Sequence, residues 1–271
     1  MAERFLLEVG GEPVGSLRSF RGLDVEAEIA TRGTGAHGMP KKHVAGVHWT
    51  PGAATFGGGM GEGMRGWIAE TLDRGTATRA GRVAVGPPGG APGFSAAFSG
   101  ARLTAVSFPA LDRASKEPAL VSVEFAARQV RWGEGGAAVE PPAKAKEWLR
   151  SSFRLEVGSL PCDRVVRIDA FTWTCAADGT VTVPDVRLVI SRADLAPWEA
   201  AARSWFLDRD FRDKHEMSGR ITFLAPDNGA ALATVELGNV GLKKFSHDEV
   251  DPSGAFAVEL YAEKLGLAAA A

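Results

Sequence analysis

A six-residue pattern that occurs twice constrains the fold of this 271-residue chain more than any other feature. Phe5-Leu6-Leu7-Glu8-Val9-Gly10, near the start, returns as Phe153-Arg154-Leu155-Glu156-Val157-Gly158. Later segments return in the same order, since Arg82–Val85 matches Arg220–Phe223 and Val123–Ala127 matches Val258–Ala262. Ordered self-similarity constrains an architecture before any residue is given a role. The sequence therefore predicts two copies of one structural unit in tandem.

The length of the chain agrees with two compact domains of ordinary size. We expect the first domain over residues 1–133 and the second over 148–271. Residues 134–147 are rich in Gly, Ala and Pro and show no apolar periodicity, which is typical of an extended linker.

Alternation of apolar and polar residues predicts half-buried antiparallel strands in both halves. In the first half, Leu23, Val25, Ala27 and Ile29 share one face, while Asp24, Glu26 and Glu28 share the other. In the second half, Val186, Leu188 and Ile190 alternate with polar residues. Apolar residues at helical spacing predict helices over 64–73 and 194–208. The predicted fold class is mainly β with one helix per domain, as two tandem antiparallel β-sandwich or barrel domains.

Charge and cysteine content bear on partners and compartment. Residues 1–133 carry 15 Lys and Arg against 12 Asp and Glu, whereas residues 134–271 carry 16 against 21. This difference favours contact between one half and the other half of a neighbouring copy, although salt screens sparse surface charges. The sequence shows no apolar signal or membrane-spanning segment, so we expect a cytoplasmic protein. In that compartment Cys162 and Cys175 are expected to be buried free thiols and not a disulfide.

Gly61-Glu62-Gly63-Met64-Arg65-Gly66 is the one pattern that favours an enzyme. G-x-G-x-x-G alone is a weak dinucleotide signal, and no acidic residue closes the next predicted strand, Arg82–Val85. A dinucleotide-dependent enzyme that uses the Gly57–Gly66 loop remains the alternative from a different class.

Other chemistry finds little support in the sequence. His43 and His48 are five residues apart on a predicted strand, which places them on opposite faces and disfavours a metal site. Lys41-Lys42 and Lys243-Lys244 are too short for a nucleic-acid stripe. We therefore expect a non-enzymatic protein with no cofactor, no metal, no specific nucleic-acid binding and no membrane insertion of its own.

Small antiparallel sheets expose unpaired backbone groups at their edges, and closing many copies into a ring removes those edges. The first half resembles the tail tube proteins of contractile phage tails and tail-like injection systems, which are relatives of the haemolysin-coregulated protein of type VI secretion. The resemblance runs from Phe5 to Trp132 and depends on the order of short motifs. These are Phe5–Val9, Gly22-Leu23-Asp24-Val25-Glu26, the Gly-rich segment Thr31–Lys42, Gly46-Val47-His48-Trp49-Thr50, Gly66-Trp67-Ile68, Arg82–Val85 and Phe98-Ser99-Gly100-Ala101. The second half resembles the family more faintly.

The resemblance implies rings of six domains whose sheets join into one β-barrel with a wide lumen, and rings that stack into a tube. With two domains per chain, a trimer would form a pseudo-sixfold ring. The resemblance further implies ring stacking through the Gly-rich loop, with Thr31, Arg32, Gly33, His37, Lys41 and Lys42. Ring formation is expected from strands that contain Leu23, Val25, Glu26, Val186 and Leu188. The implied partners are other copies of the chain, sheath, baseplate hub or spike, and tape-measure proteins. The chain would assemble in the cytoplasm and end in a phage tail or tail-like particle.

The second half departs from this pattern. Its corresponding connection, Ala176-Ala177-Asp178-Gly179-Thr180, contains an Asp-Gly pair that is typical of a tight hairpin. Two interpretations of the chain then stay open: a main tube subunit, or an adaptor that joins a sixfold tube to a threefold spike or hub. A solitary oligomeric binding module is a third.

Overall fold

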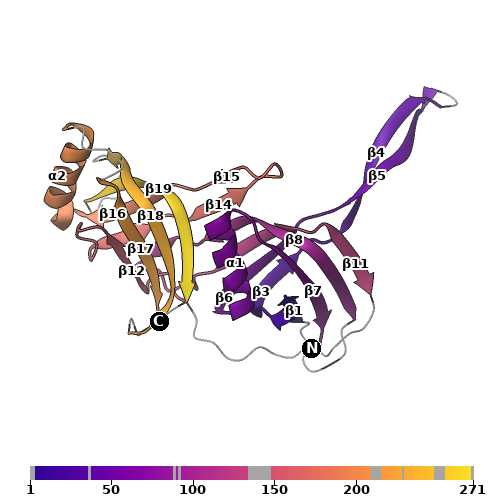
Figure 1. Ribbon diagram of the computed structural model, residues 1–271, viewed down its shortest axis with the longest axis horizontal. Coiled ribbons are helices and arrows are strands. Elements are labelled where there is room, and N and C mark those ends of the chain that lie inside the picture. The colour runs from indigo at the N-terminus through magenta and orange to yellow at the C-terminus, as the bar shows by residue number, and fades with distance from the viewer. Residues whose placement is uncertain are drawn as a thin grey trace.

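The computed structural model describes residues 4–35, 38–87, 90, 93–133, 148–208, 215–227, 229–246 and 254–269, so the predicted linker 134–147 lies outside the described residues. The first half contains β1 (Arg4–Val9), β2 (Glu12–Pro13), β3 (Gly15–Arg21), β4 (Val25–Thr34), β5 (Pro40–Trp49), β6 (Gly52–Met60), α1 (Glu62–Arg74), β7 (Thr78–Gly86), β8 (Phe94–Phe108), β9 (Leu111–Asp112), β10 (Val121–Ala126) and β11 (Gln129–Gly133). The second contains β12 (Phe153–Val157), β13 (Val165–Ile168), β14 (Phe171–Cys175), β15 (Val181–Thr182), β16 (Val186–Ser191), the 3-10 turn η2 (Arg192–Asp194), α2 (Leu195–Phe206), β17 (Met217–Leu224), β18 (Ala231–Ser246) and β19 (Ala255–Ala269). The predicted class, mainly β with one helix in each half, is confirmed (Figure 1).

The main sheets of the two halves have the same strand order. The first runs β1-β7-β8-β10-β6-β3 and the second β12-β17-β18-β19-β16-β13, so each strand has a counterpart at the same place in the chain and in the sheet. The register also matches, because Glu8 lies opposite Arg82 and Glu156 lies opposite Arg220. Both pairs form ion pairs, with Arg Nε to Glu Oε2 distances of 3.2 and 2.5 Å.

Along the chain, α1 lies between β6 and β7, and α2 lies between the equivalent strands β16 and β17. Each helix packs its apolar face on a sheet. Trp67 of α1 and Trp198 of α2 are fully buried, and each indole nitrogen donates a hydrogen bond of 2.9 Å to a backbone carbonyl, of Ala77 and Pro161 respectively. A buried Trp needs such an acceptor for its N–H group. The spacing of apolar residues placed both helices correctly to within two residues at each end.

The halves exchange strands. β14 of the second half pairs with β8 of the first, and β9 of the first half pairs with β13 of the second. Most buried hydrophobic residues of both halves form one continuous cluster, and Leu6 and Ala84 form a separate pair. The division into a first domain that ends at residue 133 and a second that begins at residue 148 stays a prediction. Strands of the two halves are joined by backbone hydrogen bonds, β8 to β14 and β9 to β13.

Cys162 and Cys175 are buried free thiols, as expected. Burial raises the pKa of the Cys162 thiol to about 11, because the apolar surroundings disfavour the thiolate. Neither helix in the described ranges is long and apolar enough to cross a lipid bilayer.

We predict that Trp173→Ala destabilises the whole chain and not the second half alone. Trp173 lies on β14 opposite Val106 of β8 and is only 1% exposed. Removing a buried Trp costs about 3–5 kcal/mol of the free energy of unfolding. Urea unfolding followed by circular dichroism measures the loss. Val181→Ala, at a half-exposed site on β15, is the control and should change stability by no more than about 0.5 kcal/mol. Equal effects of the two variants would contradict the shared core.

Candidate assembly surface

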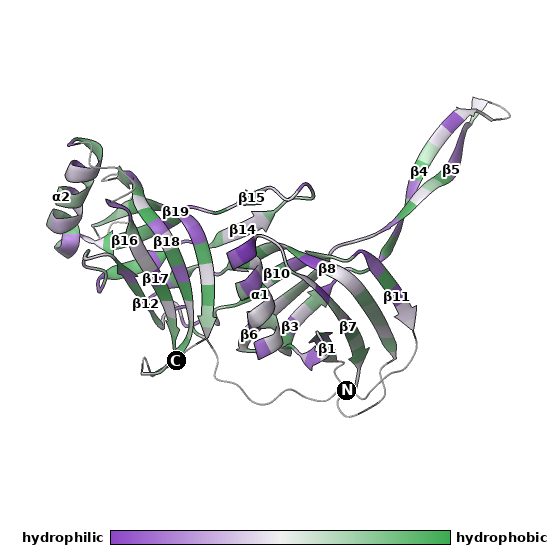
Figure 2. Ribbon diagram, viewed as in Figure 1, coloured by the Kyte–Doolittle hydropathy of each residue, from purple (hydrophilic) through white to green (hydrophobic). Residues whose placement is uncertain are grey.

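Among the described residues, the β4–β5 hairpin carries a group of exposed large hydrophobic side chains. β4 and β5 form a sheet of their own, and Figure 1 shows this sheet projecting away from both halves. Val25, Ile29, Val44 and Val47 lie on one face of it and are between 41% and 63% exposed. Figure 2 shows the hydrophobic residues along both strands. The predicted alternation is thus present, but the single chain leaves the apolar face exposed on a strand that was predicted to be half-buried.

The hairpin also corrects the predicted Gly-rich loop. Thr31, Arg32 and Gly33 lie in β4, and Lys41 and Lys42 lie in β5, where Thr31 pairs with Lys42 and Arg32 with Lys41. Most of the segment predicted as a loop is therefore strand. His37 lies outside the described residues. The structure brings the remaining predicted stacking residues together in the far part of the β4–β5 hairpin.

The base of the hairpin is fixed by a sharp backbone bend. Gly22 and Leu23 both have positive φ, 88° and 60°, and Leu23 is buried. The indole nitrogen of Trp132 donates a 3.1 Å hydrogen bond to the Leu23 carbonyl, and the Trp132 ring meets Trp49 edge-on, with 5.4 Å between ring centroids. These contacts set the direction in which the hairpin leaves the sheet.

Sequence reasoning missed this anchor. The available signal was two tryptophans, Trp49 and Trp132, at the ends of segments with strand character. Their partnership depends on a long-range pairing of β11 with β8, which no local pattern shows.

The second half carries a short counterpart, the β14–β15 hairpin. Its turn closes with a hydrogen bond from the Thr180 amide to Asp178 Oδ1 at 2.9 Å, and Gly179 has a φ of 90°, as the Asp-Gly signal predicted. β14 is docked on the end of β8, where the rings of Phe108 and Phe171 stack with centroids 5.0 Å apart. The two hairpins thus differ: the chain itself covers one strand of the short hairpin, and the long one projects.

Val186 and Leu188 of β16, predicted to help form the ring, are fully buried. β16 lies between β19 and β13 and pairs with both. The structure places these residues in the core of the second half, whereas Val25 and Glu26 lie on the exposed hairpin and Leu23 at its base. A role for any of them in ring formation stays a prediction.

The G-x-G-x-x-G segment enters α1, but its surroundings do not fit a dinucleotide. β6 and β7, on either side of α1, form only antiparallel pairs among the described residues, whereas the nucleotide fold needs a parallel βαβ unit. A hollow of about 280 Å³ beside the helix is lined by Glu12 and Glu62, which would repel a pyrophosphate, with Arg79 as the one basic residue.

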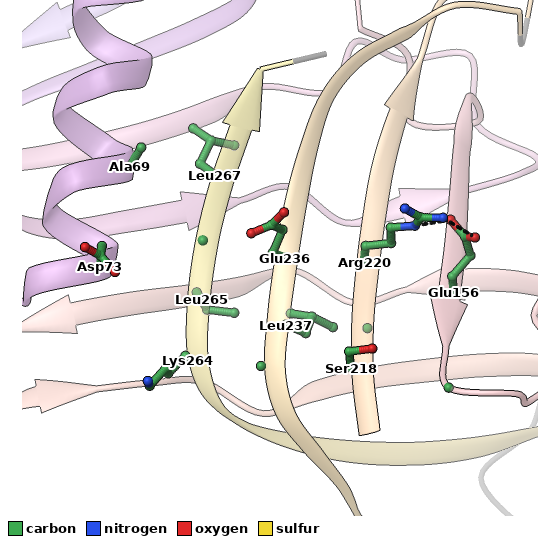
Figure 3. A pocket seen from close by; sticks show the side chains of 14 residues that line it. Ala69, Asp73, Glu156, Ser218, Arg220, Glu236, Leu237, Lys264, Leu265 and Leu267 are labelled. Carbon is green, nitrogen blue, oxygen red and sulfur yellow. Dashed lines mark hydrogen bonds and ion pairs between the residues drawn. The ribbon is translucent and has the colours of Figure 1, made fainter. Parts of the chain in front are cut away.

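A wider groove of about 690 Å³ lies where α1 faces the second sheet (Figure 3). Asp73 of α1 and Glu236 and Lys264 of the sheet line it, together with the paired Arg220 and Glu156. A hydrogen bond from Arg220 lowers the pKa of the Glu156 carboxyl, and the same contact raises the pKa of Arg220, because each charge stabilises the other. Within the described residues, no group of three His, Cys, Asp or Glu side chains is placed to hold a metal ion.

Comparison with known proteins gives likeness only among solved structures. No protein-family profile matches the chain, and no curated protein matches its sequence. A chain of the sheath–tube complex of PVC, an extracellular contractile injection system in the extended state, is 19% identical, with 48% of this chain and 88% of that chain covered and a TM-score of 0.41. The PVC sheath/tube terminator in the extended state is also 19% identical, with 48% and 93% covered and a TM-score of 0.41. The tube-terminating cap of the anti-feeding prophage is 21% identical, with 48% and 88% covered and a TM-score of 0.41.

We predict that Gly22→Ala disrupts the base of the hairpin more than Gly33→Ala disrupts its far part. Both glycines have positive φ, so each alanine costs about 1–2 kcal/mol in backbone strain. A Cβ at residue 22 would also lie 1.9 Å from the Pro51 carbonyl oxygen, whereas a Cβ at residue 33 meets nothing within 4 Å. Urea unfolding of the two variants gives the comparison. Equal losses of stability would show that the close approach at Gly22 does not constrain the bend.

Proposed function

We propose that this chain is a structural subunit of the tube of a phage tail or a phage tail-like contractile injection system. Each chain contributes two homologous units that arose by tandem duplication, and three chains close a pseudo-sixfold ring. The observation that carries the proposal is the junction inside the chain, where β14 of the second half extends the sheet of the first half at β8. Two units of one topology joined edge to edge are the repeating step from which a ring is built.

Ring stacking is assigned to the β4–β5 hairpin. An isolated two-stranded hairpin is marginally stable in water, and one with an exposed apolar face is an interaction site. The part of this face that contains Ile29, Val44 and Val47 is therefore covered by the neighbouring ring. The other face carries polar pairs such as Glu26 with His48, whose Oε2 and Nε2 atoms lie 3.3 Å apart, and such a face is suited to water.

The resemblance noted in the sequence supplies the remaining partners. Sheath subunits would surround the tube, tape-measure protein would fill it during assembly, and a baseplate hub or spike would close one end. In this proposal the chain has no enzymatic role, and it passes from the cytoplasm into the assembled particle.

One observation favours an adaptor at the end of the tube as a second candidate. The long hairpin belongs to the first half alone, and its counterpart β14–β15 is short and partly docked within the chain. A ring of three chains would then present three projecting hairpins, which matches a threefold spike as well as a stacked tube.

Negative-stain electron microscopy of the purified chain over a concentration series tests the proposal. Rings with a central hole and a threefold or pseudo-sixfold outline support it, and the length of any stacks separates a tube subunit from an adaptor. Compact monomers at every concentration would contradict it.

We predict that replacing residues 33–40 by Asn-Gly yields rings that no longer stack into long tubes. The replacement joins Arg32 and Lys41, which already pair across the hairpin, through a two-residue turn of the type preferred in hairpins. The shortened hairpin would keep its base but would no longer extend far enough to contact the neighbouring ring. Tube lengths measured by electron microscopy are the readout, and unchanged lengths would rule out a stacking role for this segment.

We predict that Val47→Asp also prevents stacking while it leaves the single chain intact. Val47 is 63% exposed, so the substitution should change the free energy of unfolding by no more than about 0.5 kcal/mol. In the stacked tube the same carboxylate would be buried against apolar residues. Glu28→Gln, on the opposite face of the hairpin, is the control and should stack normally. Tubes formed equally well by both variants would show that the apolar face is not the one covered.

A further inference from the structure

We infer that the ring closes by a specific strand addition between copies, in which Asp24, Val25 and Glu26 of one chain lie opposite Ser246, Phe245 and Lys244 of the next. The two segments run antiparallel, and the pairing repeats between chains the junction that each chain already contains between its own halves. The inference rests on the proposed ring, and it names the surface and register that close it.

The junction inside the chain is the template. Thr172, Trp173 and Thr174 of β14 lie opposite Ser107, Val106 and Ala105 of β8. The Thr172 hydroxyl donates a 2.9 Å hydrogen bond to the Ser107 hydroxyl on the exposed side. On the other side Trp173 and Val106 are buried together. The junction thus combines a polar pair, an apolar pair and continuous backbone pairing.

The acceptor in the second half follows from register. Val106 of β8 lies opposite Val123 of β10, and Phe245 of β18 lies opposite Val258 of β19. Val123 and Val258 are matching positions of the internal repeat, so Phe245 corresponds to Val106. The neighbouring residues Lys244 and Ser246 then correspond to Ala105 and Ser107.

The edge of β18 that would receive the strand from the next chain is equivalent to the edge of β8 that pairs with β14. β7 pairs with β8 only as far as Arg102, and β14 continues along the same edge. In the second half β17 pairs with β18 as far as Val240, and the pairs from Leu242 to Ser246 are formed with β19 on the opposite edge. Each strand of a sheet has two edges. Among the described residues, the edge of β18 that pairs with β17 as far as Val240 continues along Leu242–Ser246, and this continuation corresponds to the edge of β8 on which β14 lies.

The donor in the first half follows from the hairpins. Glu26 pairs with His48, and His48 lies four residues before Gly52, the first residue of β6. In the second half, Thr174 pairs with Thr182, and Thr182 lies four residues before Val186, the first residue of β16. Gly52 and Val186 pair in turn with Phe125 and Leu260, which match in the repeat. Glu26 therefore corresponds to Thr174, Val25 to Trp173 and Asp24 to Thr172.

The chemistry of the three pairs is complementary. Glu26 would meet Lys244, which is the opposite-charge arrangement that stabilises cross-strand neighbours. Val25, 41% exposed in the single chain, would be covered beside Phe245, which is half-buried against Phe256. The Ser246 hydroxyl could donate to the Asp24 carboxylate, where the template has a hydroxyl pair. None of the three pairs places like charges or an apolar and a charged side chain opposite each other.

A second copy of the chain is the occupant that fits. Each chain presents one donor strand, at the base of the projecting hairpin, and one acceptor edge, on the second sheet, and Figure 1 shows these in opposite halves of the molecule. The contact is therefore head-to-tail, which closes into a ring when the rotation per step divides a full turn. Because the halves share one topology, the step inside the chain and the step between chains are nearly the same.

Cysteine cross-linking tests the register in the full chain with Cys162 and Cys175 replaced by alanine. Asp24→Cys with Ser246→Cys should give covalent dimers and trimers under mild oxidation at concentrations where rings form. Asp24→Cys with Lys244→Cys, two residues along the same face, should cross-link far less. Ser107→Cys with Thr172→Cys is the matched control inside the chain, and should oxidise without joining chains.

The outcomes separate the inference from the proposed ring. Efficient cross-linking of residue 24 to 244 instead of 246 would overturn the register. Rings visible by electron microscopy without cross-links in either pair would place the interface elsewhere and leave the proposed function standing. Monomers alone under all conditions would overturn both.

Charge reversal gives an independent measurement. Glu26→Arg should raise several-fold the concentration needed for ring formation, because it places a cation opposite Lys244. Glu28→Arg reverses a charge two residues further along the same face of β4, beyond the three proposed pairs, and should leave ring formation unchanged. Mass photometry at a series of dilutions reads out both variants. An equal effect of the two substitutions would count against the pairing.

Discussion

Two long strands, one in each main sheet, need backbone hydrogen-bond partners along their whole length, and the rest of the structure depends on this constraint. β8 and β18 have 15 and 16 residues, longer than the strands β7 and β17 that pair along one of their edges. A strand that outruns its neighbour leaves N–H and C=O groups without partners, which is costly if they are buried and invites association if they are not. In the first half this chain meets the constraint by placing β14 on the end of β8. The connection of the halves, their common core and the proposed ring all follow from that one solution.

The sequence predicted the parts of the fold that local patterns control. Apolar spacing around Trp67 and Trp198 located both helices, because a helix face must be apolar wherever it packs on a sheet. The Asp178-Gly179 turn was also predictable, since its geometry depends on those two residues themselves. The internal repeat predicted two units with strands in the same order, and the two sheets have that order.

The errors have a common physical cause. Alternation at Val25 and Ile29 identifies an apolar face but does not identify what covers it, so a half-buried strand was predicted where the single chain leaves both residues exposed. Glycines near Thr31 and Lys42 were taken as loop, yet Gly33, with a φ of 50°, is accommodated within a strand at an irregular register. The docking of β14 on β8 joins residues more than 60 positions apart, and no local pattern records such a partner.

The two hairpins differ although they occupy the same place in two halves of one topology. In the second half the chain ends its hairpin at a tight turn and uses β14 to extend a sheet of its own first half. In the first half the same position begins a long arm, held at its base by Trp132 and by the bend at Gly22. In the proposed tube, an arm with a fixed direction would lose less conformational freedom on binding than a flexible loop does, so more of the burial of Ile29 and Val47 would remain as binding free energy. Two sheets of one topology therefore differ at one hairpin: β14 completes a sheet within the chain, whereas the β4–β5 hairpin projects with its apolar face exposed.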